Sequence, residues 1–186
     1  MGTTAHSIPK TISDEDLGRI SHHLAGSFTR VDRHGVAELT VAAAELHALV
    51  SSLRGDLAFN MLLDIVGLDY LEYPGHAGER FAVLYQLKSL SGGKRLTLRI
   101  WLPEESPSVK SIHDLYKDAN WLEREVYDQF GVHFNGHPNQ KRILNHIQFV
   151  GHPLRKNYPI TKRQWLTESD DLKDEMEKRL KLRGYT

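Results

Sequence analysis

The densest group of residues that could carry chemistry lies in the stretch WLEREVYDQFGVHFNGHPNQKRIL, residues 121–144. Its carboxylates Glu123 and Glu125 stand among aromatic residues, and basic residues follow them. Paired carboxylates carry out acid–base or glycosidase chemistry only when both converge on one bond. On a helix, which advances about 100° per residue, these two lie near opposite margins of the apolar stripe and diverge. The pattern therefore favours a docking surface over paired-carboxylate catalysis.

A helix is predicted over residues 112–130, and it sets the direction of each of these side chains. One face of the helix is apolar and is expected to pack on a sheet: Ala119, Leu122, Val126 and Phe130. Arg124 and Asp128 fall on the opposite face at i,i+4 spacing and are expected to pair. Two interpretations of Glu123 and Glu125 stay open. They are solvated or salt-bridged surface residues, or they form half-buried ion pairs with the basic tail or with a neighbouring chain.

The histidines after this helix raise the question of a metal site, with His133, His137 and His152 as candidate zinc ligands. The chain has no cysteine, no acid lies near these histidines, and Gly and Pro residues keep them off one helical face. A di-iron site needs Glu-x-x-His, and neither Glu123 nor Glu125 has a histidine three residues later. We therefore predict no metal, and we expect these histidines to donate hydrogen bonds to backbone carbonyls at turns.

The chain from Gln129 to Thr167 contains no Asp or Glu. Its cations are Lys141, Arg142, Arg155, Lys156, Lys162 and Arg163. Residues 136–141 (GHPNQK) are echoed by residues 151–156 (GHPLRK), and in each a glycine permits a sharp turn and a proline removes a backbone donor. This composition predicts an extended tail rather than a packed lobe. A charged helix from Glu168 to about Leu182 should follow, with a narrow apolar stripe that can rest on a surface.

The elements upstream predict an α+β fold, with a mixed, largely antiparallel sheet, helices packed on one side, an extended C-terminal arm and a terminal helix. The expected strands are residues 28–32, 36–41, 59–70, 81–90 and 95–102; the expected helices are residues 13–24 and 42–53. In KRLTLRIWL, residues 94–102, apolar residues alternate with polar ones, so one face should be buried. We divide the chain into an α+β domain, residues 1–130, and a basic tail with a C-terminal helix, residues 131–186, for docking to other subunits.

Composition narrows the function classes. The 186 residues are 40% hydrophobic and carry no net charge, so a real core is expected and neither nucleic acid nor acidic lipid is indicated as a partner. Absence of cysteine excludes thiolate-ligated Fe–S clusters. The sequence shows no apolar run of a signal peptide or membrane helix and no glycine-rich nucleotide loop. Taken alone, these observations favour a binding or assembly subunit over a self-contained enzyme.

The stretch that opens this section resembles the signature of the 30 kDa subunit family of respiratory complex I, which comprises the C subunits of bacterial NADH-quinone oxidoreductases. The residues that match are Glu123, Arg124, Glu125, Asp128, Phe130, Gly131, His137, Lys141, Ile143 and Leu144. The segment FVGHPLRKNYP, residues 149–159, matches the next family block. The resemblance covers most of the chain, with weak detail before Phe59. Gln129 departs from the family pattern, in which this position is usually apolar.

The resemblance implies a structural subunit in the peripheral arm of complex I, with no catalytic site or cofactor of its own. NADH, FMN, Fe–S clusters and quinone would be bound by other subunits. The partners would be the 49 kDa-like D subunit and the B and I subunits, on the cytoplasmic side of the bacterial inner membrane, with no direct membrane span and no nucleic acid. The residues implied at subunit interfaces are the matched Glu123, Arg124, Glu125, Asp128, Phe130, Gly131, His137 and Lys141, together with Pro138, Arg142, Gly151, His152, Pro153, Leu154, Arg155 and Lys156.

Two alternatives remain open at this point. Related chains occur in membrane-bound hydrogenases and in ferredoxin- or F420-dependent dehydrogenases, and the electron input of such machines lies on other subunits. A second alternative is an RNA-binding module, in which bases stack on Tyr158 and Trp165 while the tail's cations meet phosphate. The zero net charge and the absence of an RNP-type aromatic motif weigh against the RNA-binding module.

Overall fold

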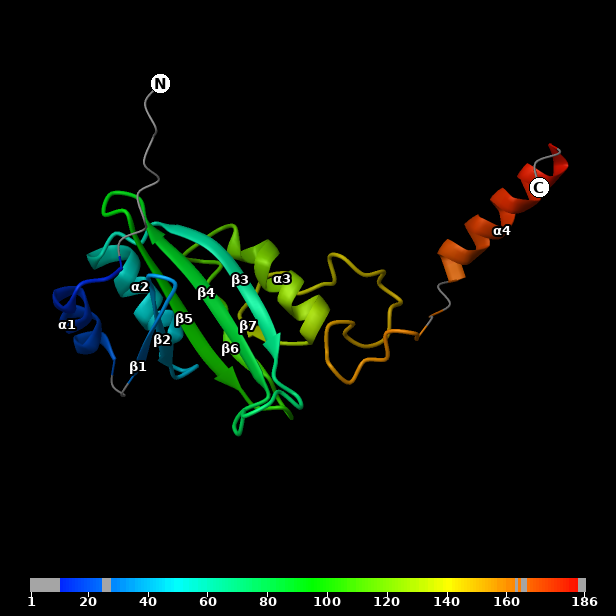
Figure 1. The fold of residues 1–186 in the computed structure, drawn as a ribbon. Coiled ribbons are helices and arrows are strands. Elements are labelled where there is room, and N and C mark those ends of the chain that lie inside the picture. The colour runs from blue at the N-terminus through cyan, green and yellow to red at the C-terminus, as the bar shows by residue number, and fades with distance from the viewer. Residues whose placement is uncertain (1–10, 25–27, 163, 165–166, 184–186) are drawn as a thin grey trace, which may run out of the picture.

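The computed structural model describes residues 11–24, 28–162, 164 and 167–183. Figure 1 shows a sheet with helices behind it, followed by an irregular segment and a separate terminal helix. The elements are α1 Asp14–His23, β1 Thr29–Arg33, β2 Val36–Val41, α2 Leu46–Asp56, β3 Met61–Asp69, β4 Phe81–Ser89, β5 Lys94–Leu102, β6 Ser108–Lys110, α3 Ala119–Phe130, β7 His133–Asn135 and α4 Thr167–Leu182.

The main sheet has five strands in the order β1-β2-β5-β4-β3. β2 and β5 run parallel, with Leu39 opposite Leu98, and every other neighbouring pair in this sheet is antiparallel. Short parallel strands β6 and β7 form a second ladder. The prediction of an α+β fold with a mixed, largely antiparallel sheet is therefore confirmed.

Local sequence explains where several elements begin and end. Ser13 and Asp16 form a capping box that starts α1, as the acidic first turn predicts. His34 and Gly35 both adopt positive φ, 52° and 77°, which gives the β1–β2 hairpin a turn matched to the twist of its strands. The sequences RHG, residues 33–35, and SGGK, residues 91–94, are typical of hairpin connections, and the strands on either side of each pair antiparallel. α2 runs past Gly55, so the glycine does not end that helix as its type suggests.

The core lies on one face of the sheet. In β5 the alternating residues Leu96, Leu98, Ile100 and Leu102 are at most 1% exposed, as the alternation predicts. The helices α2 and α3 lie behind the sheet in Figure 1 and cover this face, with Leu46, Leu49, Val50 and Leu53 of α2 buried against it. Each fully buried apolar side chain of this size contributes about 1.5–3 kcal/mol. The buried face of the sheet is therefore the surface on which α3 packs.

The predicted helix over residues 112–130 is too long, because α3 begins only at Ala119. Residues before it form turns instead, and Ile112 donates its backbone N–H to the carboxylate of Glu123, 2.8 Å away. Tyr116 reaches across to the backbone carbonyl of Phe59. These bonds fold the segment back along α3 rather than extending the helix axis.

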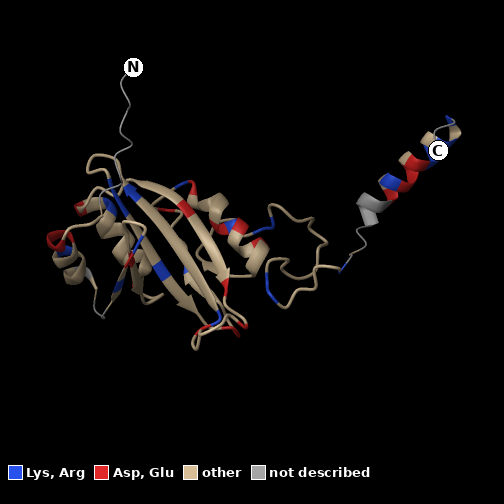
Figure 2. Cartoon of the chain, viewed as in Figure 1, with Lys and Arg blue, Asp and Glu red and all other residues tan. Residues whose placement is uncertain are grey.

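The core continues past residue 130, since Val132 and Phe134 are at most 2% exposed. The described residues from 136 to 162 then contain no helix or strand, and we call this segment the arm. Figure 2 shows Lys and Arg but no Asp or Glu along the arm, and α4 lies beyond it, apart from the sheet. A division of the chain into a domain and a docking tail at residue 130 stays a prediction.

Candidate functional site

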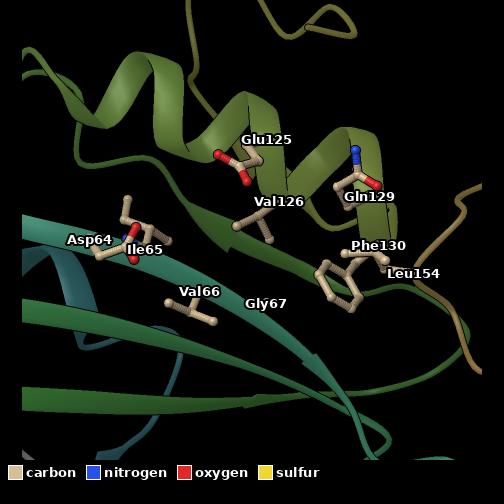
Figure 3. A pocket seen from close by; sticks show the side chains of 9 residues that line it. All are labelled: Asp64, Ile65, Val66, Gly67, Glu125, Val126, Gln129, Phe130 and Leu154. Atoms are coloured by element: carbon tan, nitrogen blue, oxygen red, sulfur yellow. The ribbon is translucent and has the colours of Figure 1, made fainter. Parts of the chain in front are cut away.

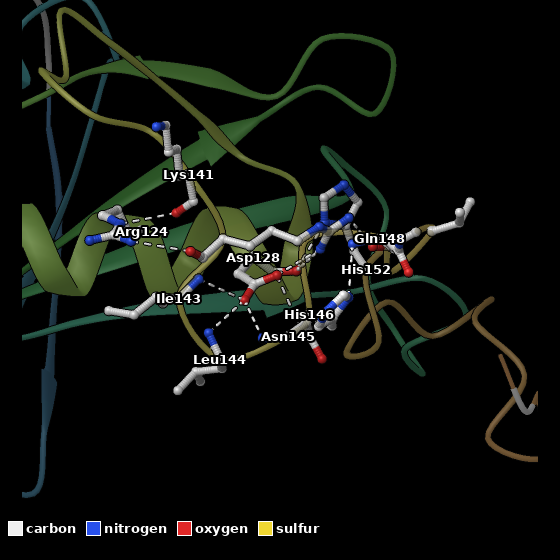
Figure 4. Close-up of polar contacts among 12 residues, drawn as sticks. Arg124, Asp128, Lys141, Ile143, Leu144, Asn145, His146, Gln148 and His152 are labelled. Carbon is white, nitrogen blue, oxygen red and sulfur yellow. Dashed lines mark hydrogen bonds and ion pairs between the residues drawn. The ribbon is translucent and has the colours of Figure 1, made fainter. Parts of the chain in front are cut away.

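The arm is anchored to α3 by the carboxylate of Asp128, which is fully buried. Its Oδ2 accepts hydrogen bonds from the backbone N–H groups of Ile143, Leu144 and Asn145 at 3.1, 2.8 and 2.8 Å. Its Oδ1 accepts from Arg142 Nη1 at 2.6 Å and from Asn145 Nδ2 at 3.1 Å. Figure 4 shows the donors of Ile143, Leu144 and Asn145 converging on the one carboxylate. A single acid on the helix thus holds a complete turn of the arm.

The electrostatics of Asp128 follow from this arrangement. Burial on its own would raise the pKa of the carboxyl. The hydrogen bonds from the backbone of Asn145, from the Arg142 guanidinium and from the other donors outweigh burial and lower this pKa to about 2. Asp128 is therefore ionised at neutral pH and acts as a permanent anionic anchor.

The arm also satisfies the carboxyl end of α3, where a helix leaves its last carbonyl groups without internal partners. His152 Nδ1 lies 3.0 Å from Asp128 O, the Leu154 N–H donates to Gln129 O at 3.1 Å, and Arg155 Nε donates to Phe130 O at 2.6 Å. Cations are favoured at this end of a helix because the aligned peptide dipoles give it a partial negative charge. The second GHP block of the sequence is therefore a helix cap supplied by the arm.

Arg124 does not pair with Asp128, which corrects the i,i+4 prediction. Its guanidinium donates to Lys141 O at 3.0 Å and to Arg142 O at 3.1 Å, and it lies over the ring of Trp121. Asp128 takes Arg142 as its cation instead. The two residues share a face of α3 as predicted, but the arm lies between them and each binds the arm (Figure 4).

Gly131 makes the close approach of arm and helix possible. It ends α3 in a left-handed conformation with φ of 75°, and its N–H donates to Tyr127 O at 2.8 Å. A Cβ at this position would lie 2.5 Å from Arg155 Nη2 and 2.6 Å from the His152 ring. Only glycine fits both the backbone conformation and the space left by the two capping side chains.

A second anchor, which the sequence analysis did not select, joins the arm to the sheet. Asp69 and Arg80 form a buried two-bond ion pair with distances of 2.9 and 2.8 Å. Asp69 Oδ2 also accepts from the backbone N–H of Lys156 at 2.9 Å, and Arg80 Nη2 donates to Asn157 Oδ1 at 2.9 Å. The sequence did contain a clue to this pair. Asp69 is the last residue of β3 and Arg80 directly precedes β4, so a hairpin of these two strands brings the acid and the arginine together. The arm is therefore held at both Asp128 and Asp69.

Glu123 is not a surface residue, nor is it half-buried, which corrects both interpretations left open by the sequence. It is 0% exposed and accepts hydrogen bonds from the Ser111 hydroxyl and from the Ile112 N–H. Burial raises the pKa of this carboxyl to about 7, with a contribution from the negative charge of Asp114, against those two hydrogen bonds, which favour the carboxylate. Glu123 thus braces the segment before α3, and it faces the protein rather than a partner.

This anchored arm coincides with a known family signature. Residues 39–164 match the family described as the respiratory-chain NADH dehydrogenase, 30 kDa subunit. The chain belongs to the 30 kDa subunit family. The matched span includes the sheet from Leu39 onwards, α3 and the whole arm, so Asp128, Asp69 and their partners all lie inside it.

Relatives within the 30 kDa subunit family are similar over much of the chain. NADH-quinone oxidoreductase subunit 5 of Thermus thermophilus is 52% identical over 56% of this chain, a match that spans about half, 53%, of that relative's length. The C subunit of the NADH-quinone oxidoreductase of Neisseria meningitidis serogroup B is 41% identical, over 79% of this chain and 76% of the relative.

Two solved structures resemble the fold. The trypsin-resistant fragment (1–134) of Nqo5 superimposes with a TM-score of 0.60 and 38% identity, over 68% of this chain and 97% of that one. A chain of an archaeal membrane-bound sulfane sulfur reductase gives a TM-score of 0.52 at 24% identity, over 86% of this chain and 89% of that one. The second likeness shows a shared fold alone.

The histidines of this family member do not form a metal site in the part of the chain that the structure describes. No three His, Asp or Glu side chains there come together as metal ligands would. His137 lies 3.0 Å from the carbonyl of Asn120, and His152 lies against that of Asp128, so each donates to a backbone oxygen as expected. His133 is exposed and contacts the ring of Tyr127.

The remaining residues of the predicted interface differ in exposure. Phe130 packs against the core and Leu154 is 54% exposed. Gly151 accepts from Arg142 Nη2 at 2.8 Å, and Pro153 is half-buried. Four others are exposed like Leu154: Glu125, Pro138, Lys141 and Lys156. None of the helices that the structure describes has the length and apolar character needed to cross a lipid bilayer.

Glu123→Gln should change how stability depends on pH. The pKa of Glu123 rises from 4.5 in the unfolded chain to about 7 in the fold, so the folded state holds this proton more tightly over that range. Stability from this group therefore falls as pH rises from about 4.5 to about 7. The unfolding free energy of the wild type relative to Glu123→Gln should fall by up to about 3 kcal/mol between pH 4.5 and 7.5, as measured by urea denaturation.

Burial lowers the pKa values of His137 and His152, so these histidines give stability the opposite slope near neutral pH. Their common contribution cancels in the difference between wild type and variant. His137 Nε2 lies only 4.0 Å from Glu123, so the comparison is repeated in a His137→Asn background. A difference that does not change with pH in either background would show that Glu123 keeps the same protonation state on unfolding.

Proposed function

We propose that the chain works as the C subunit of a proton-translocating NADH:quinone oxidoreductase, in the peripheral arm of the complex and without a cofactor of its own. Membership of the 30 kDa subunit family and the names of the relatives support this assignment. NADH, FMN, Fe–S clusters and quinone are then bound by other subunits. The cysteine-free sequence supports this division of labour, because Fe–S clusters are held by thiolates.

We propose further that the arm and α4 are the parts that bind neighbouring subunits, with the 49 kDa-like D subunit as the main partner and the B and I subunits nearby. The single observation that carries this proposal is an arm held in place by Asp128 and Asp69 while its apolar side chains face solvent. Leu144, Ile147, Val150, Leu154 and Ile160 are 54–99% exposed. Leu172, Met176 and Leu180 form a further apolar stripe on α4, each at least 47% exposed.

Exposed apolar side chains gathered on one segment are typical of interaction sites. The chain's place would then be on the cytoplasmic side of the bacterial inner membrane, held there through the complex. Tyr158, a base-stacking candidate for RNA, stacks on Phe149 with ring centroids 5.8 Å apart and receives a hydrogen bond from Gln164. Trp165 lies outside the described residues. No contact in the described part of the tail favours nucleic acid.

Rates of cleavage by trypsin should distinguish the anchored part of the arm from the part of the tail that a partner orders. In the isolated full chain we expect fast cleavage after the exposed Lys162 and within α4. Cleavage should be slower at Arg142, whose side chain is held by Asp128, and at Lys156, whose backbone N–H is held by Asp69. Addition of the 49 kDa-like partner should slow the distal cleavages at least tenfold. The relative solved as a trypsin-resistant fragment (1–134) supports this expectation.

The control is a surface lysine in the sheet domain, Lys117, whose cleavage should not change when the 49 kDa-like partner is added. Equal cleavage of the distal sites with and without this partner would contradict the docking role of the tail. Affinity purification of the chain from native membranes, followed by mass spectrometry, tests the assignment to the complex itself. Recovery with hydrogenase subunits in place of flavin-bearing ones would assign the chain to that related machine.

A further inference from the structure

A groove runs along the outer side of β3, and nothing in the described chain fills it. Two adjoining hollows of about 210 and 390 Å³ share Gly67, Phe130 and Leu154 as walls. Figure 3 shows the first hollow between β3 below and α3 above, with Val126 and Phe130 pointing down from the helix. The groove is thus bounded by the sheet, by α3 and by the anchored arm.

The strand beside this groove is the last strand of its sheet. β3 pairs with β4 on one side only, so the backbone groups of its other edge have no strand partner among the described residues. Exposed edges invite pairing with another chain, and proteins usually protect them with charge or brevity. The opposite edge, β1, is protected in both ways, because it has five residues with the sequence TRVDR. β3 has nine residues, MLLDIVGLD, of which six are apolar.

Two carboxylates stand at the rim of the groove without a cation among the described residues. Asp64 accepts the N–H of the next residue, Ile65, at 2.8 Å, and Glu125 is exposed on the adjacent turn of α3. Neither makes an ion pair with a described Lys or Arg. Gln129 also lines the hollow, with its side chain near the rim in Figure 3. The first hollow therefore combines an apolar floor with a negative rim, whereas Lys156 borders the second.

We propose that an extended segment of a neighbouring subunit of the complex adds to the edge of β3 and lies in this groove. Strand addition supplies the missing backbone hydrogen bonds, and alternate side chains of the added segment enter the hollows beside Ile65 and Phe130. The negative rim favours a segment that carries a Lys or Arg, because this cation can form ion pairs with Asp64 and Glu125. The segment is thus a basic and apolar extended strand.

Gly67 keeps the floor of the groove open to α3. A Cβ at this position would lie 2.5 Å from the Phe130 ring, so glycine lets the ring pack directly on the strand. Leu154 and Lys156, which border the second hollow, belong to the arm. The groove is therefore continuous with the proposed docking segment. The inference rests on the proposed function in that it takes the occupant from the same complex.

The test uses the whole complex assembled in its native membrane, with Gln129→p-benzoylphenylalanine as a photocrosslinker at the rim. We expect a crosslink to one segment of one neighbouring subunit, with alternating apolar residues and a Lys or Arg within about three positions, the reach of one long side chain along a strand. The matched control is Trp121→p-benzoylphenylalanine, on the same helix and 60% exposed, which should not reach that segment. Absence of any protein crosslink from Gln129, or a crosslink to a helix or to the chain's own arm, would overturn the proposal.

A second measurement tests the charges. A synthetic peptide of the crosslinked segment is titrated against the full chain by fluorescence anisotropy. The double variant Asp64→Asn/Glu125→Gln should weaken binding about tenfold, since it removes both anions that meet the segment's cation. Asp118→Asn, an exposed acid just before α3, should leave the affinity unchanged. Equal affinity for the double variant and the wild type would show that Asp64 and Glu125 do not bind a cation of the segment.

The two proposals fail separately. If the 49 kDa-like partner protects the distal tail while Gln129 forms no protein crosslink, docking by the tail stands and the groove is unoccupied. If Gln129 crosslinks as expected while the tail is cleaved equally with and without that partner, strand addition stands and the tail is not the docking element.

Discussion

Asp128→Ala is expected to release the arm from α3 while the sheet stays folded. The substitution removes the acceptor of three backbone N–H groups and leaves Arg142, whose side chain is only 15% exposed, without its anion. Breaking a buried charge pair on one side costs about 3–5 kcal/mol when the remaining charge stays buried. The arm avoids part of this cost by moving into water, so the expected change is local opening of the arm rather than global unfolding.

Hydrogen exchange measures this opening at the amides involved. The N–H groups of Ile143, Leu144 and Asn145 should exchange roughly 10²-fold faster in Asp128→Ala than in the wild type, since about 3 kcal/mol corresponds to a factor of that order. Amides of β4 and β5 should keep their protection. Asp118→Asn is the matched control, because Asp118 is exposed and makes no side-chain capping bond. Unchanged exchange at the three amides would show that Asp128 does not hold the arm.

The same anchor predicts how acid acts on the arm. The pKa of Asp128 is lowered to about 2 in the fold, below its ordinary value of 3.8, so the folded state favours the carboxylate. Its contribution to stability is therefore present above about pH 4 and lost as pH falls towards about 2. Protection of the three arm amides, measured by hydrogen exchange, should disappear over this acid range before the core opens.

Gly131→Ala is expected to destabilise the contact between the arm and the end of α3, and Gly136→Ala provides its control. Both glycines adopt left-handed backbone, with φ of 75° and 83°. Both alanine variants therefore carry the same conformational strain of about 1 kcal/mol. Only at Gly131 does the new Cβ meet neighbours, Arg155 and the His152 ring, whereas at Gly136 no atom lies within 4 Å.

The difference between these two variants isolates the contact between arm and helix end. Overpacking of this kind costs about 1–3 kcal/mol beyond the strain, because Arg155 and His152 have to leave the carbonyls of α3 that they cap. Urea denaturation at neutral pH should show a lower unfolding free energy for Gly131→Ala than for Gly136→Ala by that amount. Equal values for the two variants would mean that the capping side chains move aside freely.

Much of the fold follows from local sequence, and the site follows from it only in part. The alternation in residues 94–102 assigns β5 and its buried face, and His34-Gly35 assigns a hairpin, because each depends on neighbours in the chain. The family signature locates Asp128 and the second GHP block. These features need no knowledge of the long-range path of the arm.

The errors arise where a distant segment decides the environment of a residue. A helical wheel places Glu123 at the margin of the apolar stripe of α3. In the structure Ser111 and Ile112 fold over that margin and bury the carboxylate. The wheel places Asp128 on the outer face, and burial there comes from residues 142–145 of the arm. Asp69 and Arg80 meet because β3 and β4 pair in the register that sets Asp69 opposite Phe81. Spacing along one element cannot report such contacts.

The two anchors of the arm also bear on the order in which the complex is built. Asp128 holds residues 143–145 and Asp69 holds residue 156, so this stretch is fixed to α3 and to the sheet by contacts within the chain itself. If the arm docks as proposed, it is therefore shaped before any other subunit arrives. A prefolded stretch meets its partner without an entropic penalty for ordering, which speeds productive encounter and slows release. On the proposed docking role, the free chain would thus offer its neighbours a preformed surface, and α4, which has no such anchor among the described residues, would be positioned by the partner.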